Sequence, residues 1–191
     1  MKSIRRLYFY LVAFISIEVV LWGLVGLLRS IVDETISGGA DALAQAMALI
    51  LVGVPMFLVH WLWVQRAAAR DDEEKTASLR AVFFYAILLA TLIPVVQNLL
   101  SFIDRALVHS AGLGLGRAFI TFREQTLADN LIAIVMNGIV AGYFWNVLCT
   151  EWRTLPDKEN FAEVRRLYRY LWMLYGLLMT VIGAQQILRF L

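Results

Sequence analysis

Long apolar stretches alternate with short charged segments along this chain, and five of these stretches are of membrane-spanning size. A helix needs about 20 mostly apolar residues to cross a hydrocarbon core of ~30 Å. Polar residues do not gather on one face of the five stretches, as they do in the surface helices of soluble proteins. The pattern therefore predicts an all-α integral membrane bundle that forms one transmembrane domain over residues 1–191. The predicted spans are Leu7–Leu28, Leu43–Val64, Ala81–Ile103, Leu131–Leu148 and Leu167–Leu188, of which the fourth is the shortest.

Composition favours a membrane environment and excludes two other classes of protein. Of the 191 residues, 61% are hydrophobic and only 17% are charged, whereas soluble domains have about half and about a quarter. The net charge of +2 is too small to indicate nucleic acid as a partner. The single cysteine, Cys149, excludes an intramolecular disulfide framework and a site with several cysteine ligands.

Lysine and arginine lie mainly on one side of the predicted membrane. The amino-terminal tail and the second and fourth connections hold twelve of them, and the other side holds five. Because cytoplasmic segments carry the excess of basic residues, we expect the amino terminus in the cytoplasm and the carboxyl terminus outside. Aromatic residues crowd the helix ends on the basic side, which is typical of a membrane interface and agrees with this orientation.

Short sequences recur at the start of three spans and indicate an internal repeat. Residues 5–10 (Arg-Arg-Leu-Tyr-Phe-Tyr) recur at residues 165–170 (Arg-Arg-Leu-Tyr-Arg-Tyr), with a weaker copy at residues 80–85 (Arg-Ala-Val-Phe-Phe-Tyr). Spans two and three also align with spans four and five at a constant offset of 85 residues, so that Gly53 matches Gly138. Since equivalent helices run in the same direction, the repeat is a parallel helical hairpin. The first span resembles the second half of one such unit.

Each copy places an arginine five residues before a tyrosine at the start of a span, and two interpretations are open. In the first, arginine places its charge among lipid headgroups and tyrosine lies at the same boundary. In the second, these side chains form a basic, aromatic groove that binds a lipid headgroup or an anionic segment of a partner. The residues concerned are Arg5, Tyr10, Arg80, Tyr85, Arg165 and Tyr170.

The connections between spans are predicted to differ in character. The second, Arg66–Arg80, contains the charged run Asp71-Asp72-Glu73-Glu74-Lys75 and is expected to form a short solvated turn. In the fourth, Asn160–Glu163 resembles a capping box that opens the last span. The third, Asp104–Asn130, is long for a compact bundle. We interpret its glycine-rich part as a flexible piece between two short interfacial segments, one of them around residues 119–122.

Glu18 is the only acidic residue within any predicted span, and it lies near the middle of the first. Because an ionised group is costly in hydrocarbon, this carboxyl group is expected to be protonated, paired or facing water. No lysine or arginine lies at a comparable depth, which favours neutral partners. Amide side chains on three other spans complete a predicted polar cluster: Asn137, Gln97, Asn98 and Gln185. Three hypotheses stay open for Glu18: a proton- or cation-coupled site, interhelical hydrogen bonding, and a pair with a residue of another chain.

His60, within the sequence His-Trp-Leu-Trp, is the other candidate for chemistry. Ligation of haem by two histidines is disfavoured, because the only other histidine, His109, lies outside the spans. One alternative is single axial ligation of a chlorophyll-type pigment or a haem. The other is an interfacial histidine that is hydrogen-bonded to headgroups or water. Apart from that first alternative, no cofactor and no metal are expected.

The repeated Arg-Arg-Leu-Tyr-x-Tyr helix starts, with the aromatic ending His-Trp-Leu-Trp-Val-Gln-Arg at residues 60–66, resemble an uncharacterised family of bacterial multi-pass membrane proteins. That family is defined by a domain of unknown function built from such helical repeats. The resemblance covers most of the chain and departs in the second copy, where Ala81 and Val82 replace Leu-Tyr. It implies a helical protein of the bacterial inner (cytoplasmic) membrane and brings no catalytic residues.

The sequence does not predict an enzyme. It has no pair of carboxylates within a span and no phosphate-binding loop, which are usual marks of a hydrolase or transferase. The function expected is a non-catalytic subunit that packs against a larger membrane complex, of the respiratory or photosynthetic kind. The alternative is a small oligomeric proton- or cation-coupled transporter or channel that uses Glu18. The expected partners are membrane lipids and either other membrane subunits or further copies of the chain.

Overall fold

The computed structural model describes residues 2–32, 39–110, 126–155 and 159–188. Within these ranges the chain is helical and contains no strand. Five helices are long and apolar enough to cross a membrane, so the predicted all-α architecture with five spans is confirmed. The helices are α1 (Lys2–Val32), α2 (Gly39–Arg70), the short α3 (Asp72–Lys75), α4 (Ser78–Ser110), α5 (Leu127–Thr154) and α6 (Glu159–Leu188).

The long helices extend well beyond the apolar windows that predict them. The shortest predicted span becomes a 28-residue helix, α5, which a capping box of Thr126 and Asp129 opens at its amino terminus. In the third connection, α4 continues helically to Ser110. The glycine-rich part of that connection and the proposed interfacial segment around residues 119–122 lie outside the described residues.

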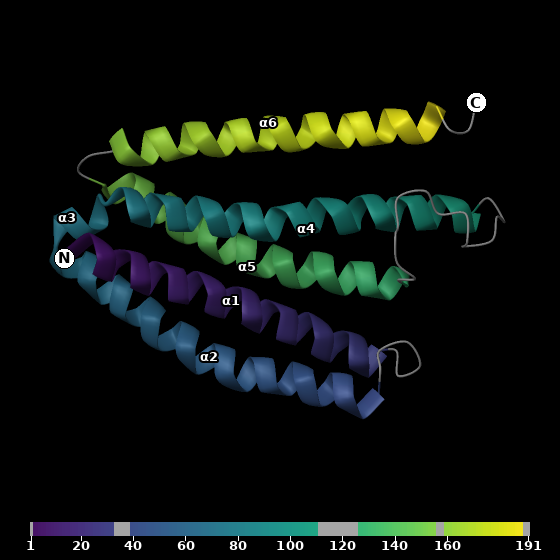
Figure 1. Ribbon diagram of the computed structural model, residues 1–191, viewed down its shortest axis with the longest axis horizontal. Coiled ribbons are helices and arrows are strands. Elements are labelled where there is room, and N and C mark those ends of the chain that lie inside the picture. The colour runs from purple at the N-terminus through teal and green to yellow at the C-terminus, as the bar shows by residue number, and fades with distance from the viewer. Residues whose placement is uncertain (1, 33–38, 111–125, 156–158, 189–191) are drawn as a thin grey trace.

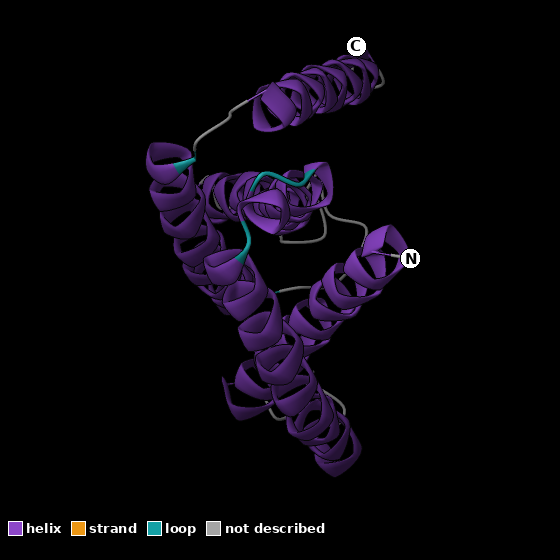
Figure 2. Cartoon of the chain, turned by 90° about the vertical axis from the view of Figure 1, so that its left-hand side faces the viewer, coloured by secondary structure: helices purple, strands orange, loops and turns teal. Residues whose placement is uncertain are grey.

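Two helical hairpins and one peripheral helix make up the bundle (Figures 1 and 2). One hairpin is α1–α2 and the other is α4–α5, and α1 contacts α4 and α5 of the second hairpin. Figure 1 places the amino terminus and α3 at one end of the bundle and the carboxyl terminus at the other. We call the first the α3 end, where α1, α4 and α6 begin and α2 and α5 finish, and the second the far end.

Glycines permit the close packing of α1 on α2. A Cβ atom added at Gly53 would lie 2.8 Å from Val20 Cγ2, and one added at Gly23 would lie 2.9 Å from Ile50 Cγ1. Small residues at helix crossings are typical of membrane bundles, where packing at close range replaces the hydrophobic effect between helices.

Aromatic side chains fill the centre of the bundle near the α3 end. Trp61 of α2 packs against Phe83 and Phe84 of α4 and against Phe144 of α5, with ring centroids 5.3–6.1 Å apart. The Trp61 indole Nε1 donates a hydrogen bond to Tyr143 Oη at 3.1 Å. Trp61 therefore joins the two hairpins through one side chain.

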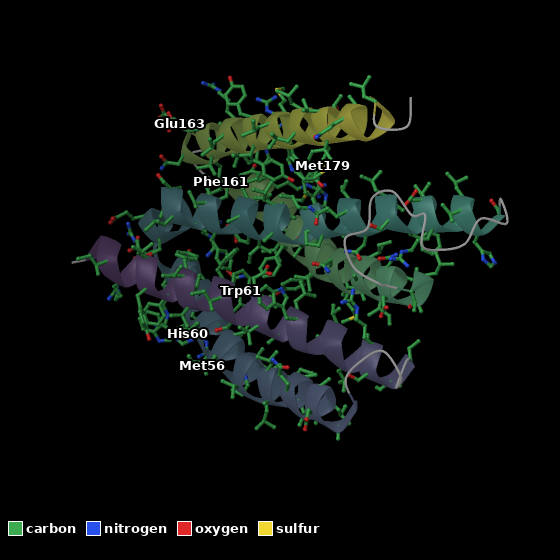
Figure 3. The ribbon with its side chains drawn as sticks, turned by 45° about the vertical axis from the view of Figure 1, so that its right-hand side comes forward. Met56, His60, Trp61, Phe161, Glu163 and Met179 are labelled. Atoms are coloured by element: carbon green, nitrogen blue, oxygen red, sulfur yellow. The ribbon has the colours of Figure 1, made fainter. Side chains whose placement is uncertain are left out.

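Helix α6 lies apart from the other helices (Figure 2) and packs along α4. No residue in its most apolar 18-residue window is buried, against 44% in the corresponding window of the α3–α4 segment. Phe161 is the one fully buried residue among the described side chains of α6, and it lies between α6 and the rest of the bundle (Figure 3). Its ring centroid is 6.4 Å from that of Trp152 on α5.

Two connections differ from their predicted form. In the second, the charged residues form the helical turn α3, in which Glu74 is buried. In the fourth, the expected capping box does not form, because α6 already begins at Glu159 and Asn160 lies within the helix. The Asn160 side-chain amide instead donates to the backbone carbonyl of Thr76 at 2.9 Å, which ties the start of α6 to the α3–α4 junction.

Candidate functional site

Arg80, at the start of α4, is completely enclosed and joins four helices. Its Nη1 donates to Tyr10 Oη of α1 at 3.2 Å, and its Nη2 donates to Gln65 Oε1 of α2 at 2.6 Å and to Glu151 Oε1 of α5 at 2.8 Å. Its guanidinium carbon lies 5.2 Å from the ring centroid of Phe84. This enclosed position is not the one expected for an arginine that lies among lipid headgroups.

The Arg80 network links four helices at the α3 end through one buried charge. Taking a guanidinium and a carboxylate out of water is costly unless the pair is well formed and hydrogen-bonded. Here a carboxylate, an amide oxygen and a hydroxyl surround the guanidinium. Loss of Glu151, the carboxylate among them, would leave a buried charge without its counter-charge, which costs about 3–5 kcal/mol.

A second group of charges clamps α1 to α3. Arg6 Nε lies 2.8 Å from Glu74 Oε2, and Arg6 Nη2 lies 2.9 Å from Glu73 Oε1. Arg5 Nη2 lies 3.8 Å from Glu74 Oε1. On the other side, Lys75 Nζ donates to the Thr154 carbonyl at the end of α5 at 3.3 Å. The α3 turn is therefore a junction between α1 and α5.

The three copies of the arginine–tyrosine start have different surroundings. Tyr10 and Tyr85 are both 6% exposed, whereas Tyr170 is 59% exposed. Arg165 lies over the Trp152 ring, 5.4 Å from its centroid, and is otherwise exposed. The second copy buries both its arginine and its tyrosine, the first buries Tyr10 but leaves Arg5 exposed, and the third lies on the surface of the bundle.

The predicted intramembrane cluster does not form as a hydrogen-bonded group. Within the described residues, Glu18, Asn137, Gln97, Asn98 and Gln185 make no hydrogen bond with one another, and Gln97 and Gln185 are exposed. Asn137 Nδ2 donates to the carbonyl four residues earlier in its own helix, and so does Asn98 Nδ2, both at 2.8 Å. Glu18 Oε1 is buried and has no hydrogen-bond partner among the described residues.

His60 lies between α1 and α2 and is 8% exposed (Figure 3). Its Nδ1 is 2.7 Å from the Met56 carbonyl oxygen, and because a carbonyl only accepts, Nδ1 carries the proton. The rings of Tyr8 and Phe9 lie 5.9 and 5.6 Å from the imidazole. The structure thus gives His60 a backbone carbonyl and two aromatic rings as neighbours, where headgroups or water were expected. In this tautomer the Nε2 atom is the one able to ligate a metal.

Several polar residues that the structure places inside the bundle were not singled out from the sequence. At the far end, Arg29 Nε of α1 lies 3.5 Å from Asp129 Oδ1 of α5, and Arg29 Nη2 donates to the Asp129 carbonyl at 3.2 Å. Next to this pair in the chain, Asn130 is fully buried, and neither atom of its amide has a hydrogen-bond partner among the described residues. At the α3 end the missed partners are Gln65, Glu74 and Glu151. A usable signal exists for all of these residues except Glu74, since each of the others lies within three residues of the end of an apolar window.

The five apolar helices, with charged side chains enclosed near both ends, define a multi-pass α-helical membrane protein. The chain belongs to the family described as a domain of unknown function, DUF5671, which matches residues 6–139. That match covers α1 to α4 and the first part of α5. No curated protein and no solved structure matches the chain. Among the described residues there is no group of three or more histidine, cysteine, aspartate or glutamate side chains that could hold a metal ion.

Proposed function

We propose that this protein is a non-catalytic subunit of a larger complex in the inner membrane of a bacterium. The observation that carries the proposal is the position of α6, whose most apolar window contains no buried residue. Helices in lipid associate through close packing and interhelical hydrogen bonds. A neighbouring subunit would supply such contacts to α6, and the network around Arg80 would hold the other helices in a fixed arrangement.

The native mass of the protein tests this proposal. The protein is extracted from its own membranes with a mild detergent, and the complex that contains it is sized and its components are identified. Migration within an assembly of several different polypeptides supports a subunit role. Migration as a monomer or as a small homo-oligomer overturns it.

We further propose that the α3 end lies in the cytoplasm and that the two helical hairpins of the sequence repeat arose from one unit. The excess of lysine and arginine at this end supports the orientation. Labelling of single cysteines with a membrane-impermeant maleimide tests it, in a background in which Cys149 is replaced. A cysteine at Asp72 should react only after the membrane is opened, and a cysteine at Ser110 should react in intact spheroplasts.

One observation favours a second candidate function, a proton- or cation-coupled transporter or channel. Glu18 is the acidic residue of the first span, and its Oε1 is buried and unpartnered among the described residues. An intramembrane ionisable group of this kind marks a candidate site for proton or ion movement. We propose proton flux into proteoliposomes, followed with a pH-sensitive dye, as the assay. Flux that Glu18→Gln abolishes and Ser16→Ala preserves would establish this function, and no flux above protein-free liposomes would exclude proton movement.

A further inference from the structure

The third copy of the repeated helix start departs from the other two at one packing position. At the offsets of 160 and 85 residues, Arg169 of α6 aligns with Phe9 of α1 and with Phe84 of α4. Phe84 is fully buried, and the Phe9 ring stacks on Trp63 at a centroid distance of 4.3 Å. Arg169, in contrast, is exposed. A position that packs an aromatic ring in two helices is therefore a cationic surface position in the third.

Arg169 also lies deeper along its helix than the arginines at the other helix starts. It is the only lysine or arginine within any of the five predicted spans. It follows Arg165, the residue aligned with Arg5 and Arg80, by four residues, which is ~6 Å along the helix axis. Because an ionised group is costly in hydrocarbon, an arginine at this depth extends its charge towards the membrane boundary. Lipid phosphates lie at that boundary.

Arg165 and Arg169 form a basic strip on α6 beside the end of α5. Residues four apart in a helix lie on the same side. Both arginines therefore share the side on which Arg165 covers the Trp152 ring of α5, 5.4 Å from its centroid. The next residue of α5, Arg153, is exposed as well. We call Arg153, Arg165 and Arg169 the junction arginines.

The junction arginines have no counter-charge in the described part of the chain. None of them forms an ion pair or a hydrogen bond there, whereas Arg5, Arg6 and Arg80 at the same end each pair with a glutamate. Glu163, which is exposed on α6, does not pair with either junction arginine of its own helix. These three side chains thus form a site of net positive charge for an anion that the described residues do not supply.

The charges of a second copy do not match this site. In α1–α2 the acidic α3 turn is level with Arg6, with which Glu74 pairs at 2.8 Å. Arg6 aligns with Arg166, so the acidic turn of a second copy would lie almost one turn outside Arg169. At the same level α2 exposes Arg66, which would repel the junction arginines. A lipid phosphate at the membrane boundary has neither disadvantage.

We propose that the junction arginines bind the headgroup phosphate of an anionic phospholipid from the leaflet at the α3 end. Two guanidinium groups one turn apart can donate to the oxygens of one phosphate, which arginine binds particularly well. The net positive charge of the site favours an anionic lipid over a zwitterionic one, whose own cation would lie among the arginines. This inference is independent of the proposed subunit role, because lipid meets this side of α6 whether or not another polypeptide covers the rest.

Lipid titration followed by native mass spectrometry tests this site. The purified protein in detergent is titrated with phosphatidylglycerol and with phosphatidylcholine of the same acyl chains, and the lipid-bound species are quantified. We expect the wild type to prefer phosphatidylglycerol. Arg169→Phe, which introduces the residue of the other two copies, should weaken phosphatidylglycerol binding about fivefold, and Arg165→Gln combined with Arg169→Phe about thirtyfold. The single variant keeps the contact of Arg165 with Trp152, so its loss of binding cannot come from that contact.

Arg66→Gln combined with Arg70→Gln is the matched control. It also removes two exposed arginines from the α3 end, but on α2 at the opposite edge of the bundle (Figure 1). This control should change phosphatidylglycerol binding by no more than about twofold, because charges so far from the site are screened. Equal losses in the two double variants would show a general attraction of anionic lipid to a basic end and would overturn the site. Equal affinity for phosphatidylcholine, or displacement of the lipid by soluble glycerol phosphate, would do the same.

Photo-crosslinking in native membranes tests the identity of the occupant. Benzoylphenylalanine replaces Tyr170, which lies beside Arg169 and is 59% exposed. We expect adducts with lipid that decrease when Arg165→Gln and Arg169→Phe are added. A discrete adduct with a polypeptide, a second copy of this chain included, would overturn lipid as the occupant of this site.

Discussion

Arg80 Nη2 of α4 lies 2.8 Å from Glu151 Oε1 of α5, and no part of the arginine side chain is accessible to solvent. The pair closes the second hairpin at the α3 end and, through Tyr10 and Gln65, binds it to the first hairpin. The start of α4 at Arg80, which composition alone would assign to the membrane interface, is therefore part of the interior of the protein.

Removal of the Glu151 carboxylate is expected to destabilise the bundle strongly. Glu151→Ala leaves the buried guanidinium of Arg80 without a counter-charge, which lowers the free energy of unfolding by about 3–5 kcal/mol. Thermal unfolding in detergent measures the change. The control is Glu163→Ala on the exposed surface of α6, which should change stability by no more than about 0.5 kcal/mol. Equal effects of the two substitutions would contradict a structural role for the pair.

A comparison of two glycines at equivalent positions of the repeat tests the packing of the first hairpin. Gly53→Val places a side chain against Val20, whose Cγ2 would lie 2.8 Å from the new Cβ, and overpacking of this kind costs about 1–3 kcal/mol. Gly138→Val meets open space and should leave the stability of the isolated protein nearly unchanged. Unfolding of both variants in detergent gives the comparison. If Gly138→Val is the more harmful of the two, the packing of α1 on α2 is not as described.

Substitution of Glu18 separates a structural role from a coupling role. Because Glu18 Oε1 has no hydrogen-bond partner among the described residues, Glu18→Leu should leave stability unchanged or raise it. Unfolding of the wild type and of Glu18→Leu in the same detergent is the measurement. A loss of more than about 1 kcal/mol would show that this carboxyl group bonds another helix, since interhelical hydrogen bonds in membranes contribute about that much.

His60 is expected to serve packing rather than ligation of a cofactor. The purified protein should show no visible absorption band, and His60→Leu should not change its spectrum. The substitution should instead lower stability, because the imidazole fills a space between the Tyr8 and Phe9 rings. A Soret or chlorophyll band that disappears in His60→Leu would reverse this assignment and establish a single-histidine pigment or haem site.

The ends of the helices show where sequence reasoning stops. The apolar windows locate all five spans, but helical structure continues beyond them through residues that look like connections, such as Ser110 and Leu127. Polar residues there continue a helix when each finds a partner on a neighbour, as Asp129 does with Arg29. Hydropathy within one segment contains no information about partners on other helices. For this reason the sequence does not identify Glu74, Asp129 and Glu151 as members of ion pairs.

The sequence by itself determined that this protein is suited to lipid, that it is helical and that five of its helices are long and apolar enough to cross a membrane. These follow from the local requirement that every backbone polar group in lipid be satisfied within the helix. Only the tertiary structure decided which of three similar helix starts is buried, because burial depends on the neighbour that covers each one. Arg80 is enclosed since α1, α2 and α5 surround it, and Arg165 is exposed since α6 lies at the edge of the bundle.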